Sequence, residues 1–493
     1  METLPELWRR SSQRQPRRDA FVAGDRRLTY ERADERIESL AERLGELGAG
    51  AGTKVCLFFS GGPDFAVALL ATVRAGAVAC PMNPALNSRE LEQLTTLLEP
   101  DLAFHGLAGA EIISEVERQL PTAEYDDGLL RGDVAPLPRR PAEEELDGVA
   151  CILCTSGTTG LPKAGMLTHS NLISNVESLA ANKRWSEPEV FGNSLPAFHV
   201  YGITVLTLLP IYLGGTVVFI PRFTPENCLK AIESEGITRF GGVPSMFTLL
   251  NRYTGRDKLD SSSCRSWISG GAPLPRPVAD EFENKFGGKI YEGYGMLETS
   301  PGISWNLDDG EFHPGAVGRP MRDVEVRILD DESGRELPQG EIGEIVVRSP
   351  GVMKGYYRDP AATAETIRDG WLYTGDTGCF DEDGYLSLKG RTKELIIVGA
   401  NNVYPREIEA VLLEEPVVAD AAVAARQDPV RGEQIYAFVV LESGAELDAR
   451  ALKLRCRDAL AAFKVPRRIH QVDEIPRNPS GKILRSQLID GLE

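Results

Sequence analysis

The chain has 493 residues, of which 42% are hydrophobic and 26% charged, and its formal net charge is −19. This composition is typical of a folded globular protein large enough for about three domain-sized units, and it excludes a disordered or fibrous chain. The acidic balance argues against nucleic acid or an anionic membrane surface as the main partner.

The cysteines and the apolar segments indicate a protein of a reducing compartment. Cys151 and Cys154 form the single C-x-x-C, but they lie in the apolar run VACILC without a second pair or a nearby histidine to complete a metal site. We therefore expect a buried strand with free thiols and a cytoplasmic location. The N-terminus has no apolar core of a secretory signal. Residues 201–220 are uncharged and about as long as a membrane span, but Pro210 and Gly214-Gly215 predict a short helix, a turn and a strand instead.

The first half of the chain alternates between strand and helix patterns. Apolar residues at helical spacing over 28–47 precede KVCLFF, DFAVALLATVRAG and AVACPMNP, which read as a β-α-β unit. Residues 122–147 are acidic and proline-rich, and we expect them to be a surface connector. Between 190 and 294 the strands VFGNSL, TVVFI, ITRFGG, SWISGG and KIYEGYG alternate with helices predicted over 203–211, 225–235, 244–253 and 276–286.

This alternation predicts an α/β fold with parallel sheets covered by helices and with ligands at the carboxyl ends of the strands. From about 317 to 390 the pattern changes to strands with glycine-rich turns, which indicates a small antiparallel, barrel-like subdomain. After GRTKEL a further strand and helix pattern predicts a separate α+β domain of about 100 residues.

Residues 155–165, TSGTTGLPKAG, form a candidate phosphate-binding loop between a buried strand and a helix that begins near Ser170. The spacing does not fit a Walker motif. The N–H groups of residues 157–160, several hydroxyls and the Lys163 ammonium are nevertheless groups that bind phosphate oxygens. A flexible linker is the alternative reading of such a run.

Six further motifs follow this loop in a fixed order. They are LPAFHVYG (195–202), SGGAPL (269–274), YEGYGMLETS (291–300), YTGD (373–376), GRTKELIIVGANNVYPREIE (390–409) and NPSGKILR (478–485). Taken with TSGTTGLPK, they resemble the adenylate-forming superfamily, specifically its acyl- and aryl-CoA ligases, and most closely the bacterial medium- and long-chain fatty-acid ligases. The resemblance covers nearly the whole chain. It implies a large N-terminal adenylation domain over 1–391, with two helix-covered sheets and the barrel-like subdomain, and a small mobile α+β lid domain over 392–493.

The resemblance also implies roles for individual residues. The loop would close over the ATP phosphates through Thr155, Ser156, Gly157, Thr158, Thr159 and Lys163, with Mg²⁺ held by Glu298. The nucleotide would lie against Gly271, Ala272, Glu292, Gly293, Tyr294, Asp376 and Arg391. The catalytic lysine would be Lys482, which neutralises charge where the carboxylate meets the α-phosphate, and the hinge would be Lys393. The acyl and coenzyme A steps would use the gate residues His199 and Tyr201, the basic Arg222, and Gly399 and Ala400 beside the thiol route.

The pattern limits the acid that this enzyme would activate. Relatives that activate amino acids usually have Asp at the position of His199. A dicarboxylate would need a cation in the pocket, because an unpaired buried carboxylate is costly, and residues 201–220 offer none. The expected pocket wall (Val200, Tyr201, Val205 and residues 242–247) is apolar or aromatic. An uncharged acyl or aryl monocarboxylate follows, with fatty acids first.

Three positions depart from the family pattern: Ala164 and Ala400 replace glycine, and Leu297 replaces a Thr or Ser that commonly contacts the phosphate or carboxylate. Leu297 removes a hydroxyl donor, and Ala400 places a methyl group near the thiol route. Three functions therefore stay open. They are an ATP- and Mg²⁺-dependent acyl-CoA or aryl-CoA ligase, an adenylating enzyme that passes its acyl group to a carrier protein or another acceptor, and a silent nucleotide- or acyl-binding protein. We expect no nucleic acid partner and no integral membrane segment, and either a monomer or a homodimer.

Overall fold

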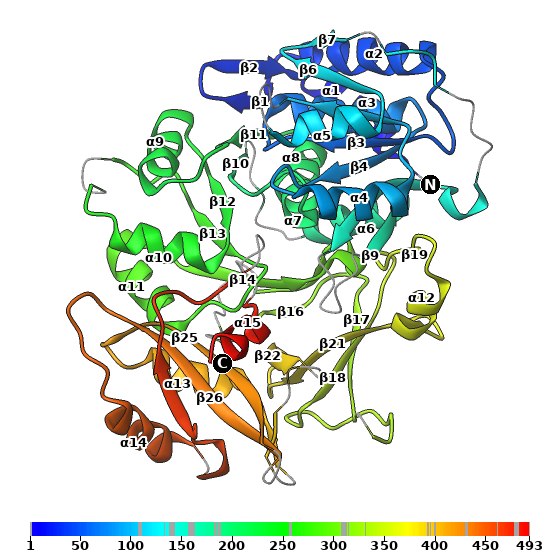
Figure 1. The fold of residues 1–493 in the computed structure, drawn as a ribbon. Coiled ribbons are helices and arrows are strands. Elements are labelled where there is room, and N and C mark those ends of the chain that lie inside the picture. Colours follow the sequence, from blue (N-terminus) through cyan, green and yellow to red (C-terminus); the bar gives the residue numbers. More distant parts are fainter. Residues whose placement is uncertain are drawn as a thin grey trace.

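Two large sheets with helices between and around them form the body of the molecule, and the C-terminal part, orange to red in Figure 1, forms a smaller unit. This confirms the predicted mixed α/β fold with a large N-terminal part and a small C-terminal part. The computed structural model describes residues 2–106, 111–132, 134–137, 143–155, 163–181, 185, 189–255, 259–306, 313, 315–330, 332–391, 394, 396–398, 401–428, 432–460, 462–477 and 483–492.

The first large sheet has eight strands in the order β19-β9-β8-β4-β3-β5-β6-β7. The strands from β8 to β6 run parallel, whereas β9, β19 and β7 are antiparallel to their neighbours. The strands are β3 (Lys54–Phe58), β4 (Val78–Met82), β5 (Leu102–His105), β6 (Thr122–Asp126), β7 (Leu129–Arg131), β8 (Val149–Thr155), β9 (Lys163–Thr168) and β19 (Gly355–Tyr356).

The second large sheet has nine strands in the order β16-β15-β14-β13-β12-β10-β11-β1-β2. It is parallel from β14 to β1 and antiparallel at both edges. The strands are β1 (Asp19–Ala23), β2 (Arg26–Thr29), β10 (Val190–Asn193), β11 (Thr216–Phe219), β12 (Arg239–Gly242), β13 (Ser266–Ser269), β14 (Ile290–Gly295), β15 (Gly302–Trp305) and β16 (Arg319–Pro320).

Three apolar cores show how the helices cover these sheets. The largest lies between the two sheets, and the others lie on their outer faces. Val55 and Leu57 of β3 face the central core, while Cys56 and Phe58 face the outer one, because successive strand residues point to opposite faces. The central helices are α1 (Leu4–Arg14), α2 (Tyr30–Glu46), α3 (Pro63–Arg74) and α6 (His169–Ala180); the outer helices are α4 (Ser88–Leu98), α5 (Glu111–Gln119), α9 (Pro225–Glu235), α10 (Pro244–Arg252) and α11 (Arg276–Phe286).

The expected surface connector over 122–147 is partly wrong, because it contains the hairpin of β6 and β7, which extends the eight-stranded sheet. Asp127 and Gly128 form its two-residue turn, and both have positive φ (46° and 83°). An Asp-Gly pair between short strands is a known signal for this turn. The acidic and proline-rich composition obscured it.

The uncharged segment 201–220 forms helical structure, a turn and a strand as predicted, but Pro210 does not break it, because helical backbone continues through this proline to Leu213. It comprises α7 (Val200–Ile203), a π-helical turn (Thr204–Leu208), α8 (Leu209–Leu213) and β11. Gly214 ends α8 in the left-handed conformation, with φ 72°. In the part of the chain that the structure describes, no helix is both long and apolar enough to cross a membrane.

Two smaller units complete the fold. The predicted antiparallel region is a five-stranded sheet in which β17, β18, β21 and β20 follow one another and β22 pairs with β21. In the C-terminal unit a hairpin and a three-stranded sheet pack with three helices. Their elements are β17 (Glu325–Leu329), β18 (Gly343–Arg348), α12 (Pro360–Thr366), β20 (Ile367–Arg368), β21 (Trp371–Phe380), β22 (Leu386–Arg391), β23 (Ile396–Val398), β24 (Asn401–Val403), α13 (Pro405–Leu413), β25 (Val418–Asp428), β26 (Gly432–Leu441), α14 (Ala449–Ala459), β27 (Arg468–Gln471) and α15 (Arg485–Asp490).

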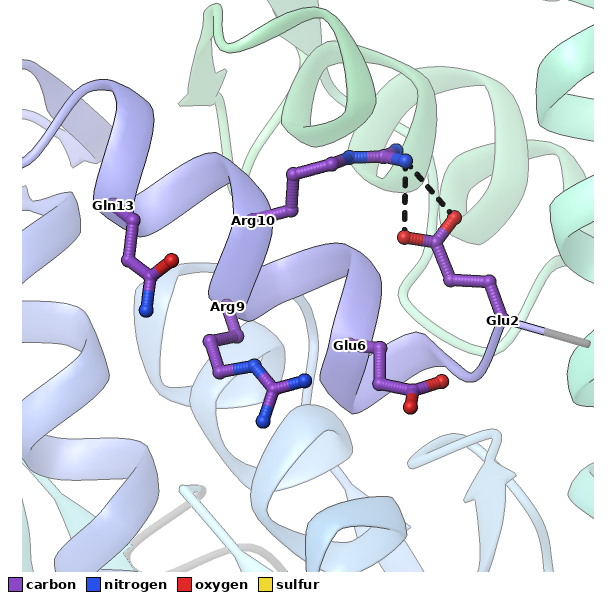
Figure 2. Close-up of a pocket in the computed structure, with 5 residues that line it drawn as sticks. All are labelled: Glu2, Glu6, Arg9, Arg10 and Gln13. Atoms are coloured by element: carbon purple, nitrogen blue, oxygen red, sulfur yellow. Dashed lines mark hydrogen bonds and ion pairs between the residues drawn. The ribbon is translucent and has the colours of Figure 1, made fainter.

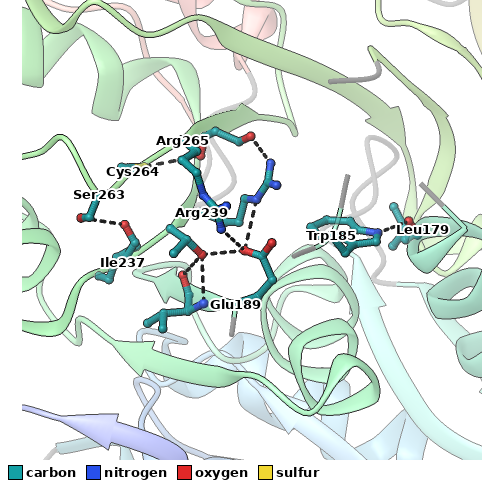
Figure 3. Close-up of polar contacts among 11 residues, drawn as sticks. Leu179, Trp185, Glu189, Ile237, Arg239, Ser263, Cys264 and Arg265 are labelled. Carbon is teal, nitrogen blue, oxygen red and sulfur yellow. Dashed lines mark hydrogen bonds and ion pairs between the residues drawn. The ribbon is translucent and has the colours of Figure 1, made fainter. Parts of the chain in front are cut away.

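A buried ion pair joins the amino ends of three parallel strands in the nine-stranded sheet (Figure 3). Glu189, just before β10, accepts hydrogen bonds from Thr238 (2.7 Å) and from Arg265 (3.2 Å), and its Oε2 lies 3.4 Å from Nε of Arg239. The Arg239 guanidinium lies 5.1 Å from the centre of the Trp185 ring. Since ligands of parallel sheets bind at the opposite, carboxyl ends, this cluster supports the fold rather than the site.

A shallow hollow lies on the first helix (Figure 2). Glu2, Glu6, Arg9, Arg10 and Gln13 line it, and Glu2 and Arg10 form an ion pair at 3.0 Å. Its charges are balanced and it lies on α1, outside the motifs that point to nucleotide chemistry.

Candidate active site

Several predicted site residues lie outside the described residues. These are Ser156, Gly157, Thr158, Thr159, Lys393, Gly399, Ala400 and Lys482, and only the backbone of Thr155, at the end of β8, is described. Their roles stay predictions. The remaining predicted residues are placed, and their contacts define the site.

Glu298 lies in a short 3-10 turn, Leu297–Thr299, directly after β14. Asn175 of α6 braces this turn by donating to the carbonyls of Thr299 (3.1 Å) and Gly302 (3.0 Å). The Met353 N–H donates to the Glu298 carbonyl at 2.8 Å. These contacts fix the backbone of the turn, and Glu298 within it is 8% exposed.

Lys163 and Glu298 meet on one tyrosine ring. The phenol of Tyr356, in β19, donates to Oε1 of Glu298 at 2.6 Å. Nζ of Lys163, the first residue of β9, lies 4.7 Å from the centre of the same ring, a favourable cation–π distance. The structure therefore brings together the predicted phosphate-binding lysine and the predicted metal-binding carboxylate.

A second cluster lies around Asp376 on β21. Its Oδ2 accepts a hydrogen bond from the Tyr294 phenol at 2.7 Å, and its Oδ1 lies 3.0 Å from Nε of Arg391 on β22. Burial, the largest single influence, works against the charged form of Arg391, but the negative charges around it, Asp376 first and then Glu394, together raise the arginine pKa. A carboxylate has further acceptor positions, so Asp376 remains able to accept hydrogen bonds from ribose hydroxyls.

Glu292 lies two residues before Tyr294 on β14, with the predicted Gly293 between them. Its Oε2 accepts a hydrogen bond from the Leu274 N–H at 3.2 Å, which ties β14 to the SGGAPL turn that carries Gly271 and Ala272. Burial raises the pKa of Glu292 to about 7, while this hydrogen bond and the charge of Arg406 act in the opposite direction. Gly271 has φ 82°, a conformation that glycine adopts without strain.

Of the two predicted gate residues, Tyr201 lies at the carboxyl ends of β12 and β13, and His199 directly precedes α7. The Tyr201 phenol donates to the Ile268 carbonyl at 3.3 Å, and its ring lies over Gly270, where a Cβ would be 3.2 Å from it. Burial lowers the pKa of His199 to about 4, and its buried Nε2 has no hydrogen-bond partner among the described residues. His199 is therefore neutral near pH 7. Arg222 lies in the loop after β11, where it is exposed and takes no part in the contacts of Tyr201 and His199.

The structure explains two of the three departures from the family pattern. Ala164 is 1% exposed, and its methyl group packs in the outer core of the eight-stranded sheet. It therefore lies on the face of β9 opposite to its neighbours Lys163 and Gly165. Leu297 packs over Gly165, because a Cβ built at that glycine would overlap Cδ2 of Leu297. Leu297 thus fills a space that the missing side chain at 165 leaves open.

The C-terminal unit presents the start of α13 to the nucleotide cluster. Arg406, the second residue of α13, is influenced by the charges of Asp376, Glu409 and Glu394, although burial lowers its pKa. It has no hydrogen bond or ion pair with any described residue. A surface ion pair of Arg252 with Glu442 (2.8 Å) also joins the two parts of the chain.

The described residues before and after the segment that contains Lys482 form ion pairs within the C-terminal unit. Arg477 forms an ion pair with Asp420 at 2.8 Å, and Arg485 binds Glu394 at 3.1 Å and Glu409. The Arg485 guanidinium also donates to the Val423 carbonyl at 2.7 Å. These pairs fix both ends of the segment that carries Lys482.

Sequence reasoning missed Tyr356 and Arg406. Tyr356 lies in MKGYYRDP, 58 residues from Glu298, and no local spacing relates the two. Arg406 lies inside a recognised motif, but the motif alone does not indicate which side chain faces the nucleotide cluster.

Fold and site together define a nucleotide-dependent, carboxylate-activating class of enzyme, and the comparisons agree. The family described as AMP-binding enzyme matches residues 8–357, and its C-terminal domain matches residues 407–482. A long-chain-fatty-acid–CoA ligase of Bacillus subtilis is 32% identical over 99% of this chain and 94% of its own. A feruloyl-CoA synthase of an Amycolatopsis species is 35% identical over 97% of both chains. The crystal structure of ATP-bound MatB from Rhodopseudomonas palustris superposes with a TM-score of 0.89 at 31% identity, covering 100% of this chain and 99% of that one.

The chain belongs to the AMP-binding enzyme family. The predicted enzyme class, an AMP-forming acid–CoA ligase, is confirmed by the family and its ligase relatives.

Proposed function

We propose that this enzyme activates an uncharged monocarboxylic acid, a fatty acid first, with ATP and then transfers the acyl group to coenzyme A. The observation that carries the proposal is that two polar clusters, one around Asp376 and one around Glu298, are joined by a single short segment of the chain. Tyr294 and Glu298, four residues apart, join the Asp376–Arg391 pair to the Glu298–Lys163 pair. One cluster suits the nucleoside and the other suits the phosphates, so a bound nucleotide would span both.

The residues fit Mg²⁺ as the bound metal. Among the described residues, no three His, Cys, Asp or Glu side chains are grouped to hold an ion. Mg²⁺ commonly binds through one or two carboxylates together with substrate phosphates, and Oε2 of Glu298 accepts no hydrogen bond from a described residue. When bound there, the ion would neutralise charge on the phosphate oxygens.

The chain's own groups then act in two steps. In the first, the substrate carboxylate attacks the α-phosphorus, the bond to the bridging oxygen breaks, and pyrophosphate leaves. Lys163 would bind the departing phosphates, and Lys482 would neutralise the approaching carboxylate. In the second, the coenzyme A sulfur attacks the acyl carbon, the carbon–oxygen bond to AMP breaks, and the thiol proton is lost.

We propose that the two steps use different poses of the C-terminal unit, which turns about Lys393 between a domain of residues 1–391 and a lid of residues 392–493. The neutral His199 and the aromatic Tyr201 would form the gate between the acyl pocket and the coenzyme A route, with Arg222 meeting a coenzyme A phosphate. Val205 (4% exposed) is a buried apolar residue of the expected pocket wall, which supports an uncharged acid, whereas Phe247 packs in the outer core of the nine-stranded sheet. A cytoplasmic location fits these substrates, and the protein would act as a monomer or a homodimer.

The test is a panel of acids from acetate to stearate, with benzoate and ferulate, assayed with and without coenzyme A. Pyrophosphate, AMP and thioester are followed separately. We expect thioester from an aliphatic acid. Release of pyrophosphate without thioester under every condition would instead support another acyl acceptor.

The Lys482→Ala variant tests the first step. We expect it to lose at least a hundredfold in acid-dependent pyrophosphate release, since one preorganised charge in an active site commonly contributes that much. It should still convert chemically prepared acyl-AMP and coenzyme A to thioester. Normal pyrophosphate release would refute the role given to Lys482.

A further inference from the structure

Two consecutive tyrosines, the last residue of β19 and the one after it, each contact one lysine and one glutamate. Tyr356 donates to Glu298 at 2.6 Å and carries Nζ of Lys163 at 4.7 Å from its ring centre. Tyr357 donates to Glu143 at 3.0 Å and carries Nζ of Lys54 at 5.5 Å. Tyr357 packs in the outer core and Tyr356 in the central core. Each tyrosine therefore links one lysine to one glutamate, but only the partners of Tyr356 belong to the candidate active site.

Strand pairing places Tyr356 between its two partners. Tyr356 pairs with Gly165 of β9, and Gly355 pairs with Met166. Lys163 lies two residues before Gly165 and so points to the same face of the strand. Cross-strand diagonal neighbours of this kind are within reach of aromatic and long side chains. Because Gly165 has no side chain, nothing on β9 separates the Tyr356 ring from Lys163 or from the turn that carries Glu298.

A buried tyrosine commonly finds an acceptor for its hydroxyl, so the hydrogen bond alone is not informative. Here the acceptor is one oxygen of a carboxylate whose other oxygen has no partner among the described residues. The phenol donates its hydrogen bond to this carboxylate at 2.6 Å and so fixes one of its two oxygens.

We infer that Tyr356 is a positioning residue that orients Glu298 toward the metal and holds Lys163 at the phosphate site before ATP binds. This inference rests on the proposed roles of Glu298 and Lys163. The phenol fixes Oε1 of Glu298, which leaves Oε2 as the oxygen for the metal. The Tyr356 ring holds the Lys163 ammonium only weakly. A phosphate oxygen binds an ammonium more strongly, so Lys163 can leave the ring when ATP binds.

The test compares Tyr356→Phe with the matched control Tyr357→Phe. Each removes one hydroxyl from a glutamate and keeps the ring. Binding of the non-reactive probe adenosine 5′-(α,β-methylene)triphosphate is measured by calorimetry with and without Mg²⁺, and pyrophosphate release is measured against Mg²⁺ concentration. For Tyr356→Phe we expect the Mg²⁺ needed for half-maximal rate to rise about tenfold, as for the loss of one hydrogen bond to a charged group, with a smaller change at saturating Mg²⁺.

The control should leave both Mg²⁺ responses unchanged. Tyr356→Leu also removes the ring, and we expect it to weaken probe binding without Mg²⁺ as well, because Lys163 loses its support. Equal Mg²⁺ responses in the Tyr356→Phe and Tyr357→Phe variants would overturn the inference.

Two further variants separate this inference from the proposed function. Glu298→Gln and Lys163→Ala should each impair probe binding or Mg²⁺ response more than Tyr356→Phe does. If both are without effect, the proposed phosphate site is wrong and the role of Tyr356 falls with it. If both impair binding and Tyr356→Phe does not, only the positioning role is wrong.

Discussion

Gly165 and Leu297 form a size-matched pair at the edge of the candidate active site. Leu297 Cδ2 occupies the position that a Cβ at residue 165 would take. Gly165 has ordinary strand geometry, paired with Leu153 and with Tyr356, so backbone strain does not require a glycine there. We expect Gly165→Val to lower the free energy of unfolding by about 1–3 kcal/mol through overpacking.

Leu297→Thr in the same chain should restore most of that loss, because threonine is shorter. A double-mutant cycle from urea unfolding measures the coupling, which we expect to be about 1 kcal/mol or more. Additive effects of the two substitutions would show that the residues do not share the space.

Glu292 gives the site an ionisation near neutral pH. Its pKa is about 7, raised by burial from an ordinary value of 4.5. Between these values the folded protein binds more protons than the unfolded chain, so the contribution of Glu292 to stability is present below pH 4.5 and is lost as the pH rises through 7. Gln at this position cannot ionise. We expect the stability of Glu292→Gln relative to the native chain to increase by about 2 kcal/mol between pH 5 and pH 8.

Thermal and urea unfolding across this pH range measure the difference. Glu283→Gln on α11, an exposed position, is the control. Its free energy of unfolding relative to the native chain should not change with pH. A flat difference for Glu292→Gln would mean that Glu292 is ionised throughout.

At the scale of elements, helix ends and buried strands were predictable where local chemistry marks them. The bounds of α9 agree with the predicted range because Pro225 begins the helix and Gly236 ends it in the left-handed conformation. The hairpin of β6 and β7 was missed because composition outweighed its Asp-Gly turn. In the candidate active site, the motifs indicated Glu298 and Lys163, but nothing in the sequence indicates that the Tyr356 side chain lies between them. That contact arises from the pairing of β19 with β9, which are distant in the chain.

The Glu189 cluster holds the amino ends of β10, β12 and β13 together (Figure 3). Glu189 is 2% and Arg239 5% exposed. Removing one partner of such a pair leaves a buried charge without its counter-ion, so we expect Glu189→Ala to cost about 3–5 kcal/mol. Urea unfolding measures this. The KM for ATP of the remaining folded enzyme should be unchanged, because the cluster lies at the end of the sheet away from the site.

Arg265→Ala is the matched control, since that arginine binds the same carboxylate but its side chain is 46% exposed. We expect a cost of less than about 1 kcal/mol. Equal losses in the two variants would contradict the assignment of the stabilisation to the buried Glu189–Arg239 pair.

At the scale of the whole molecule, the start of α13 faces the nucleotide cluster, with Arg406 near the carboxylates of Glu292 and Asp376. If the C-terminal unit adopts two poses, this contact stabilises only one of them. The residues predicted for the thiol step, Gly399 and Ala400, belong to the segment directly before α13, and we propose that the present pose is the one for the thiol step. Arg406→Glu would place a negative charge near the carboxylate of Asp376 and disfavour this pose.

We expect Arg406→Glu to slow thioester formation from acyl-AMP and coenzyme A about tenfold or more, because like charges at close range in a protein repel by more than about 1 kcal/mol. Acid-dependent pyrophosphate release should change less than twofold, since that step uses the other pose. Single-turnover assays of the two half-reactions measure the split. Arg252→Ala, which removes the exposed ion pair with Glu442 between the same two parts of the chain, should leave both rates unchanged. Equal slowing of both half-reactions by Arg406→Glu would instead mean that Arg406 acts on the nucleotide itself and not on the pose.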